Sequence, residues 1–214
     1  MLTSRGVSSL VIDNLCNQAG RRNSTVACFY FDFATPKEHS PTSALGCLLR
    51  QLVFGLEDIP EEISRAYKDR KSGIGGQAPQ LSAILKMLET TWSKKGAFIC
   101  IDALDECGDD NRVKLLDSIN QLLQKSPGTR IFVTGRPHIL PDIEKRLAGR
   151  VTSVSISSKR DDVIRYLRSR LAADTTPDAM DTRLEGDILN KIPSDNPEMY
   201  VEAVALRNPS PVIY

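Results

Sequence analysis

The chain has 214 residues, of which 41% are hydrophobic, and this length allows one sizeable core with a small appendage. Its 28 Lys and Arg residues nearly balance its 27 Asp and Glu residues, so we expect no concentrated basic face for nucleic acid or an anionic membrane. No segment of the sequence approaches the roughly 20 apolar residues that cross a bilayer. We therefore expect partners other than nucleic acid or membrane.

Cysteine usage indicates a reducing compartment. The chain has five cysteines, an odd number, and none form a C-x-x-C pair. That distribution argues against a zinc site and against a disulfide framework. Cys28 and Cys100 lie within apolar runs, where a thiol acts as a small core hydrophobe. We expect a cytoplasmic protein.

In the first half of the chain, one strand is expected among several helices. The run VACFYFDF, residues 26–33, is rich in aromatic and β-branched residues and predicts a buried strand. Ser40 and Pro41 supply a helix start. Apolar residues recur at helical spacing in four segments, which are residues 8–16, 42–54, 60–71 and 80–93. A flexible loop is expected over residues 73–76.

In the second half, strands and helices alternate. The expected strands are residues 97–104, 130–134 and 151–156. The expected helices are residues 113–124, 141–147 and 161–173, with a charged loop over 105–111. Nearly unbroken apolar strands between helices predict an α/β fold in three layers, with a parallel sheet covered by helices on both faces.

The C-terminal tail carries a weaker pattern. Beyond Pro193 the periodicity fades and three further prolines follow. We expect this part to be irregular or only partly packed. The predicted organisation is a core over residues 1–175 and a partly irregular extension over residues 176–214.

An acidic strand end carries the first functional signal. The segment FICIDALDEC places Asp102 directly after an apolar run, with Asp105 and Glu106 close behind. Ligands of open α/β sheets bind beyond the carboxyl ends of the strands. There Asp102 would hold Mg²⁺, Glu106 would act as the base for an attacking water, and Asp105 would assist it. The alternative is a strand that simply ends in a solvated acidic loop.

The second signal is the segment RIFVTGRP. It predicts a strand that ends in Thr134 and is followed at once by Arg136. A guanidinium at a strand tip could contact the γ-phosphate of a nucleotide, because its planar fork suits phosphate oxygens. The alternative is a surface arginine that caps a loop. The strand lies about 30 residues after the acidic strand end, a spacing at which neighbouring strand tips can face one site.

Together, FICIDALDEC and RIFVTGRP resemble the NACHT division of the signal-transduction ATPases, and in particular the nephrocystin-like N-terminal segment of fungal NLR-like proteins. SSLVIDNL, FYFDF and SALGCLLRQL share the resemblance, which covers about residues 8–170. It implies a P-loop NTPase-like fold and a switch that binds Mg²⁺ with ATP or GTP and controls self-association. By this resemblance, Asp102 lies in the Walker B segment and Arg136 lies at the sensor 1 position. Thr134 and Arg136 are the expected cofactor-binding residues.

The sequence departs from that family at its N-terminus. Relatives carry a G-x-x-x-x-G-K-[ST] loop before the helix that here reads SSLVIDNL, whereas this chain has MLTSRGV there. The phosphate loop and the strand before it are therefore expected to be missing, and an apolar sheet edge is expected to stay unpaired and to favour aggregation. Without the backbone amides of that loop, we expect little or no hydrolysis.

Two functions stay open at this point. One is a partial nucleotide-binding switch core that associates with itself or with full-length NLR-like relatives. The other is a non-catalytic interaction module, a pseudo-ATPase that binds no nucleotide. An unrelated hydrolase or oxidoreductase has little support, because the sequence has neither a G-x-S-x-G nor a G-x-G-x-x-G motif.

Overall fold

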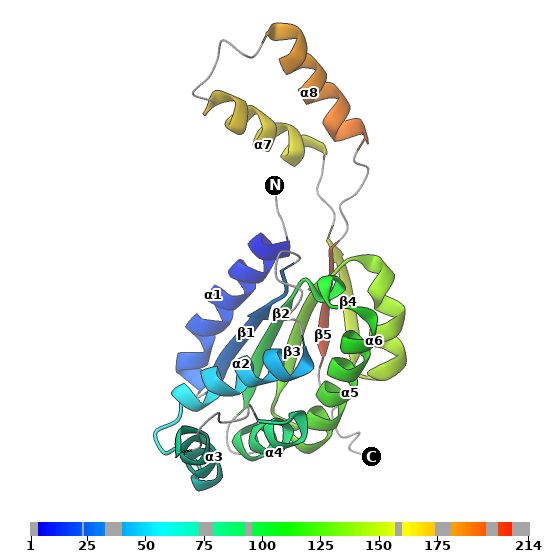
Figure 1. Cartoon of the computed structure of the whole chain (residues 1–214). Helices are drawn as coiled ribbons and strands as arrows, with labels where there is room; N and C mark the ends of the chain where they lie inside the picture. The colour runs from blue at the N-terminus through cyan, green and yellow to red at the C-terminus, as the bar shows by residue number, and fades with distance from the viewer. Residues whose placement is uncertain are drawn as a thin grey trace.

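Three apolar runs of the sequence form neighbouring parallel strands in one half of a five-stranded sheet (Figure 1). They are β1 (Thr25–Tyr30), β2 (Ala97–Asp102) and β3 (Arg130–Gly135). The computed structural model describes residues 4–22, 24–32, 40–72, 79–92, 96–156, 160–173, 181–195 and 201–206. The predicted α/β fold with a parallel sheet flanked by helices is confirmed for this half.

The other half of the sheet contains one antiparallel strand. The strand order is β1-β2-β3-β5-β4, in which β4 is Val151–Ile156 and β5 is Val201–Leu206. Strand β5 runs antiparallel to both β3 and β4. Strands β3 and β4 therefore point in the same direction and are separated by the width of a single strand.

Helices cover both faces of the parallel half. Helix α1 (Ser4–Arg22) contacts β1, β2 and β3. It packs on the face that carries Asp102, because Ser8 of this helix is hydrogen-bonded to that carboxylate. Side chains alternate along a strand, so Ile99 and Ile101 point to the opposite face. On that face α2 (Pro41–Phe54), α4 (Leu81–Trp92) and α5 (Asp109–Lys125) pack against one another.

The core lies between the sheet and these three helices. Ile99, Ile101, Leu48, Leu88 and Leu116 are each at most 1% exposed and belong to one hydrophobic cluster. Each fully buried side chain of this size contributes about 1.5–3 kcal/mol relative to leaving it in water. The apolar spacing that predicted the helices thus also identifies the faces that are buried.

The edge of the sheet at β1 is closed by a side chain. Gln51 of α2 accepts a hydrogen bond from the backbone N–H of Cys28 at 2.9 Å and donates one to its carbonyl oxygen at 2.7 Å. The amide of Gln51 therefore pairs with the outer side of β1 as a peptide group of another strand would. This contact blunts an edge that could otherwise recruit a second chain.

The start of α2 follows the predicted signal. Ser40 has extended backbone angles, its side chain accepts a hydrogen bond from the N–H of Ser43 at 3.0 Å, and Pro41 opens the helix. This is a standard N-terminal cap, in which a hydroxyl satisfies an amide that the helix leaves free. The predicted helix start is confirmed.

Three further helices begin and end within a few residues of the predictions. They are α3 (Glu61–Ser72), α6 (Leu140–Arg146) and α7 (Arg160–Ala172). The predicted charged loop over 105–111 differs from the structure, because most of these residues lie in the short 3-10 helix η2 (Leu104–Glu106) and the first turn of α5. Acidic residues stabilise a helix N-terminus, which explains why Asp109 and Asp110 start α5 rather than a loop. The predicted loop over 73–76 lies outside the described residues.

The tail prediction needs correction. Strand β5 lies beyond Pro193, in the part of the chain that was expected to be irregular or only partly packed. Helix α8 (Thr182–Asp195) lies almost wholly before Pro193, within the extension that was expected to be only partly irregular. Prolines flank β5 in the sequence, but none interrupts its six residues, so the strand can pair on both sides. How the chain divides into domains at residue 175 stays a prediction.

The expectation of an unpaired sheet edge is also wrong at β3. Five residues of β3, from Ile131 to Gly135, pair with β5, which occupies the position next to β3. The chain thus closes this edge with its own C-terminal strand.

Helices α7 and α8 form an antiparallel hairpin apart from the body (Figure 1). Among its described residues, α7 contains no buried side chain, and Leu184 of α8 is 46% exposed. Within the described part of the chain, no helix has the length and apolar character that crossing a membrane requires.

Candidate functional site

The candidate site lies where the carboxyl ends of β1, β2 and β3 meet. Because these strands are parallel, Tyr30, Asp102 and Gly135 end at the same side of the sheet, and Tyr30 is directly opposite Asp102. The N-terminal half of α1 reaches this side as well, through Ser8. We call this region the rim.

Asp102 is the buried centre of the rim. It is 2% exposed, and its Oδ1 atom accepts hydrogen bonds from the hydroxyls of Ser8 and Thr134, each at 2.5 Å. Its second oxygen, Oδ2, is buried and has no hydrogen-bond partner among the described residues. A buried carboxylate oxygen without a partner is costly, so it marks a position where a cation or a donor would be stabilising.

Thr134 connects β3 to the residue that follows Asp102. Its hydroxyl oxygen accepts a hydrogen bond from the backbone N–H of Ala103 at 3.1 Å while the hydroxyl donates to Asp102. Thr134 is fully buried. One side chain therefore fixes both the carboxylate and the turn behind it.

Ala103 changes the direction of the chain at the end of β2. It has left-handed backbone angles, φ 55° and ψ 48°, which cost a non-glycine residue roughly 1–2 kcal/mol. Strain of this kind persists only where the surroundings impose it, and it clusters at functional sites. The turn brings Asp105 and Glu106 back to the rim in η2, with Leu104 fully buried beneath them.

Asp105 holds Arg136 in place. Its side chain is 8% exposed, accepts a hydrogen bond from the backbone N–H of Arg136 at 3.3 Å, and lies 3.2 Å from the Nε of the same residue. The Arg136 side chain is 72% exposed, so its guanidinium group faces solvent at the rim. A Cβ atom at Gly135 would lie 2.4 Å from Cδ1 of the buried Ile139, so a larger residue there would require that side chain to shift.

Glu106 is the third acid. Its Oε2 atom is buried and, like Asp102 Oδ2, has no hydrogen-bond partner among the described residues. The rim therefore contains two buried carboxylate oxygens whose bonding capacity is unused. The five residues singled out from the sequence, Asp102, Asp105, Glu106, Thr134 and Arg136, all lie at this one rim. Their chemical roles stay predictions.

The donors of the rim suit Mg²⁺ better than a transition metal. Within the described ranges no group of three or more His, Cys, Asp or Glu residues could hold a metal by itself. Mg²⁺ does not need such a cage, because it keeps several waters and is commonly held by one or two carboxylates together with substrate phosphates. The free oxygens of Asp102 and Glu106 are hard ligands of this kind.

Two residues of the rim were missed in the sequence. Tyr30 is 39% exposed opposite Asp102, and burial, followed by the negative charges of the Cys28 thiolate and Asp102, raises the pKa of its phenol. The phenol therefore stays protonated and can donate a hydrogen bond. Ser8 looked like one more residue of a helix, and its contact with Asp102, 94 positions away, has no local signal.

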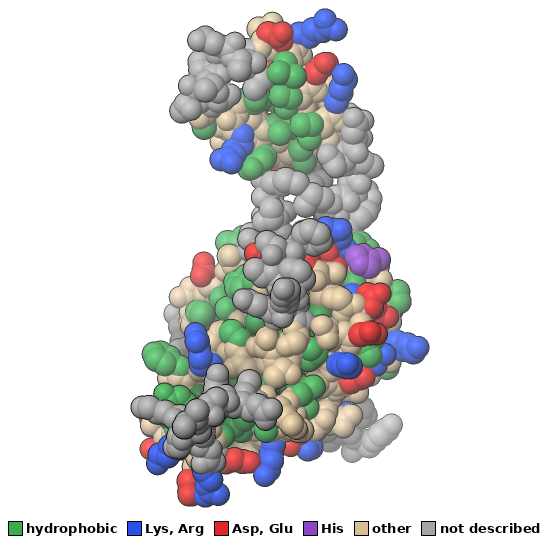
Figure 2. Space-filling model, viewed as in Figure 1, with side chains coloured by type: hydrophobic (Ala, Val, Ile, Leu, Met, Phe, Trp, Pro, Cys, Tyr) green, Lys and Arg blue, Asp and Glu red, His purple; other side chains and the backbone are tan. Residues whose placement is uncertain are grey.

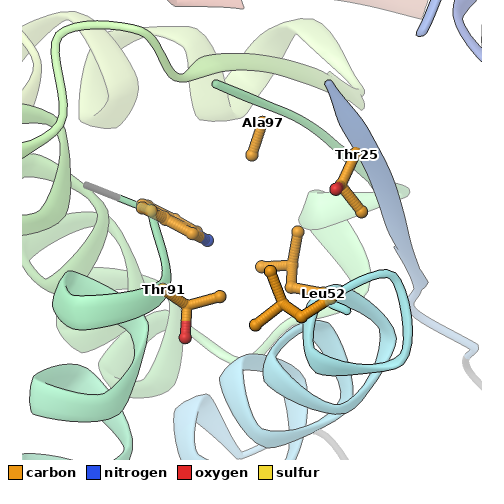
Figure 3. Close-up of a pocket in the computed structure, with 6 residues that line it drawn as sticks. Thr25, Leu52, Thr91 and Ala97 are labelled. Atoms are coloured by element: carbon orange, nitrogen blue, oxygen red, sulfur yellow. The ribbon is translucent and has the colours of Figure 1, made fainter. Parts of the chain in front are cut away.

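A small cavity lies at the other end of the sheet (Figure 3). Thr25, Leu52, Thr91 and Ala97 surround it, from β1, α2, α4 and β2. Its volume of about 10 Å³ leaves room for roughly one water molecule, whereas small-molecule pockets measure about 300–1,000 Å³. This cavity does not compete with the rim as a ligand site.

A family model described as Nephrocystin 3, N-terminal, matches residues 6–136. The chain belongs to this family. The match begins within α1 and ends at Arg136, so this nephrocystin 3 N-terminal segment contains every rim residue described above. Comparison with curated proteins and with solved structures finds no match.

Proposed function

We propose that the rim is the acidic half of a nucleotide site and that the chain is the core of a nucleotide-dependent signalling switch. The observation that carries this proposal is that two buried oxygens of the rim, Asp102 Oδ2 and Glu106 Oε2, have no hydrogen-bond partner among the described residues, while Asp105 fixes a guanidinium group at the same rim. A triphosphate with Mg²⁺ would supply both the positive charge that these oxygens lack and the anion that Arg136 suits.

Each residue has one task in this proposal. Asp102 contributes Oδ2 to the hydrated cation, while Ser8 and Thr134 hold the carboxylate through Oδ1. Asp105 orients Arg136 toward the terminal phosphate.

Glu106 and the end of α1 complete the site. Glu106 orients a water molecule through its free oxygen. The positive end of the α1 dipole lies on the same side as Ser8 and favours phosphate there. Both ATP and GTP fit this proposal, since no described residue selects a base.

We further propose that these 214 residues, by themselves, bind nucleotide without turning it over. The 214 residues contain no G-x-x-x-x-G-K-[ST] sequence, so they offer neither its nest of backbone amides nor its lysine. Charge-assisted hydrogen bonds of this kind contribute about 1.5–3 kcal/mol each, and their absence weakens binding by several kcal/mol. Such a chain acts as a binding switch in the cytoplasm, with copies of itself or NLR-like relatives as partners.

A second candidate is an interaction module that binds no nucleotide. It is favoured by the direction of β5, which begins rather than ends at the rim between β3 and β4. A strand that begins there cannot lead into a phosphate-binding loop at the rim, because such loops follow the carboxyl end of a strand.

Isothermal titration calorimetry separates the two candidates. Wild-type protein is titrated with ATP and with GTP, with and without Mg²⁺, beside the variants Asp102→Asn and Glu106→Gln. Asp110→Asn, at an exposed position of α5, is the matched control. Circular dichroism melts first establish that each variant is folded.

The proposal expects weak Mg²⁺-dependent binding that Asp102→Asn abolishes, that Glu106→Gln weakens and that Asp110→Asn leaves unchanged. Absence of heat with both nucleotides, or equal binding by wild type and Asp102→Asn, would establish the interaction module instead.

A further inference from the structure

Strand β5 lies between two strands that both precede it in the sequence. The other four strands of the described sheet come before β5, yet β5 lies inside the sheet, with Val204 opposite Val133 on one side and Ser153 on the other. Strands β3 and β4 must be in place before β5 can pair with both. Until then the sheet has an open slot with two unpaired edges, which is a template for any suitable strand.

The connection between β4 and β5 is an insertion into a β-hairpin. Ile156, the last residue of β4, is directly opposite Val201, the first residue of β5, so a two-residue turn could join the strands. The chain instead runs through residues 157–200, which include the α7–α8 hairpin. These helices contact mainly each other (Figure 1).

The α7–α8 hairpin is only loosely attached to the body. Figure 2 shows it as a separate lobe with hydrophobic side chains at its surface, and its described residues include the exposed Tyr166, Leu184 and Ile192. Moving this arm away from its own body therefore breaks few buried contacts among the described residues.

We propose that two copies of this chain exchange β5, so that the β5 of each copy fills the slot between β3 and β4 of the other. The occupant is a second copy because its β5 has the sequence and register that the slot already accepts. Exchange preserves both strand ladders, and only the arm changes its path, which is why swapping an identical element between two copies is a low-cost route to a dimer. This inference is independent of nucleotide binding.

The exchanged strand also borders the rim. In the β3–β5 ladder, Glu202 of β5 is directly opposite Gly135, and Ala203 is directly opposite Thr134. In the exchanged dimer Glu202 and Ala203 come from the second copy. Each rim is therefore completed by its partner.

Cross-linking between differently tagged copies tests the exchange. One copy carries Val133→Cys in β3 and the other Val204→Cys in β5, and both carry Cys16→Ser to remove the exposed thiol. Directly opposite residues of an antiparallel pair have Cα atoms about 4.5–5.5 Å apart, within the range of a disulfide. The copies are unfolded together, refolded at several concentrations and oxidised, and covalent pairs are read on a non-reducing gel.

Two controls accompany the experiment. Ala27→Cys and Ile99→Cys on separate copies are also opposite one another, but in β1 and β2, which are not exchanged. A short-hairpin variant, in which an Asn-Gly turn replaces residues 157–200, keeps β5 beside its own β4. A single chain with both Val133→Cys and Val204→Cys establishes that the disulfide can form.

Exchange predicts a covalent pair between the two tagged copies, and a ratio of dimer to monomer that rises about tenfold when the free monomer concentration rises about tenfold. It also predicts no pair from the β1–β2 control and a monomeric short-hairpin variant by light scattering. If the tagged copies stay separate while the double variant cross-links within one chain, or if the short-hairpin variant dimerises as wild type does, the proposal is overturned.

Discussion

The part of the chain that matches the family and the part that follows it differ in how many side chains they bury. Among the residues whose side-chain burial is described, which do not include those of β5, every buried hydrophobic residue lies at or before Leu147, and most lie within residues 6–136. In β4 the four central residues are exposed, and α7 buries none of its described residues. The first part is therefore stabilised mainly by packing, whereas β4 is stabilised mainly by its pairing with β5.

The difference teaches that strand pairing and burial contribute separately to this fold. Strand β2 is stabilised in two ways, by the burial of its apolar side chains and by hydrogen-bonded pairing with a strand on each side. Strand β4 has only β5 as a neighbour in the described sheet. Substitutions that remove apolar contacts should thus be costly in the first part and nearly silent in the second.

The largest contrast is expected between two leucines. Leu116→Ala in α5 removes a fully buried side chain and should lower the free energy of unfolding by about 2–5 kcal/mol. Leu184→Ala in α8, where the side chain is 46% exposed, should change it by less than about 0.5 kcal/mol. Urea unfolding followed by circular dichroism measures both, and similar losses would show that α8 is packed as firmly as the core.

A smaller contrast is expected between two threonines. Thr134→Val removes the hydroxyl that donates to Asp102 and accepts from Ala103, and leaves a buried N–H without its partner. We expect a loss of about 1–3 kcal/mol. Thr152→Val, at an exposed position of β4, should be neutral or slightly stabilising, because valine is favoured in strands. Equal effects in thermal melts would mean that Thr134 does not hold the rim.

The smallest effect concerns an ion pair on the surface of the first part. The hydrogen bond from Lys125, together with that from Gln121, lowers the pKa of Glu89, although burial acts against this. A lowered pKa in the folded state gives stability that is present above the unfolded pKa and lost as the pH falls through the folded value. Because Lys125 is 53% exposed, the gain is only about 0.3–1 kcal/mol.

Glu89→Gln should therefore lower stability slightly at about pH 7, and this loss should shrink as the pH falls through the lowered folded pKa of Glu89, below which the carboxyl is protonated in both states. The control is Asp187→Asn, which breaks the exposed pair with Lys191 in α8 and should have no measurable effect at neutral or at low pH. A loss from Glu89→Gln that persists at low pH would contradict the assignment of its pKa shift.

Much of the first part could be predicted because its signals are local. The run before Asp102 predicts β2, and Ser40 with Pro41 predicts the start of α2. Because β2 and β3 are parallel neighbours, Asp102 and Thr134 lie at the same rim, and this follows from strand direction without reference to side-chain contacts. The meeting of the predicted site residues follows from topology alone.

The features that were missed depend on distant contacts. Nothing in the sequence marks Ala103 as left-handed, because glycine or asparagine is the usual residue there. Strand β5 has two alanines and a glutamate between prolines, and its position is set by β3 and β4 rather than by propensity. Ser8 reaches Asp102 only because α1 packs across the sheet.

Hydrogen exchange of backbone amides, measured with and without Mg²⁺ and ATP, is the most direct test of the rim as a nucleotide site. Binding there should slow exchange at residues 102–106 and 134–136, and leave exchange at residues 151–156 unchanged. Unaltered exchange at the rim, or equal slowing in both regions, would contradict the account.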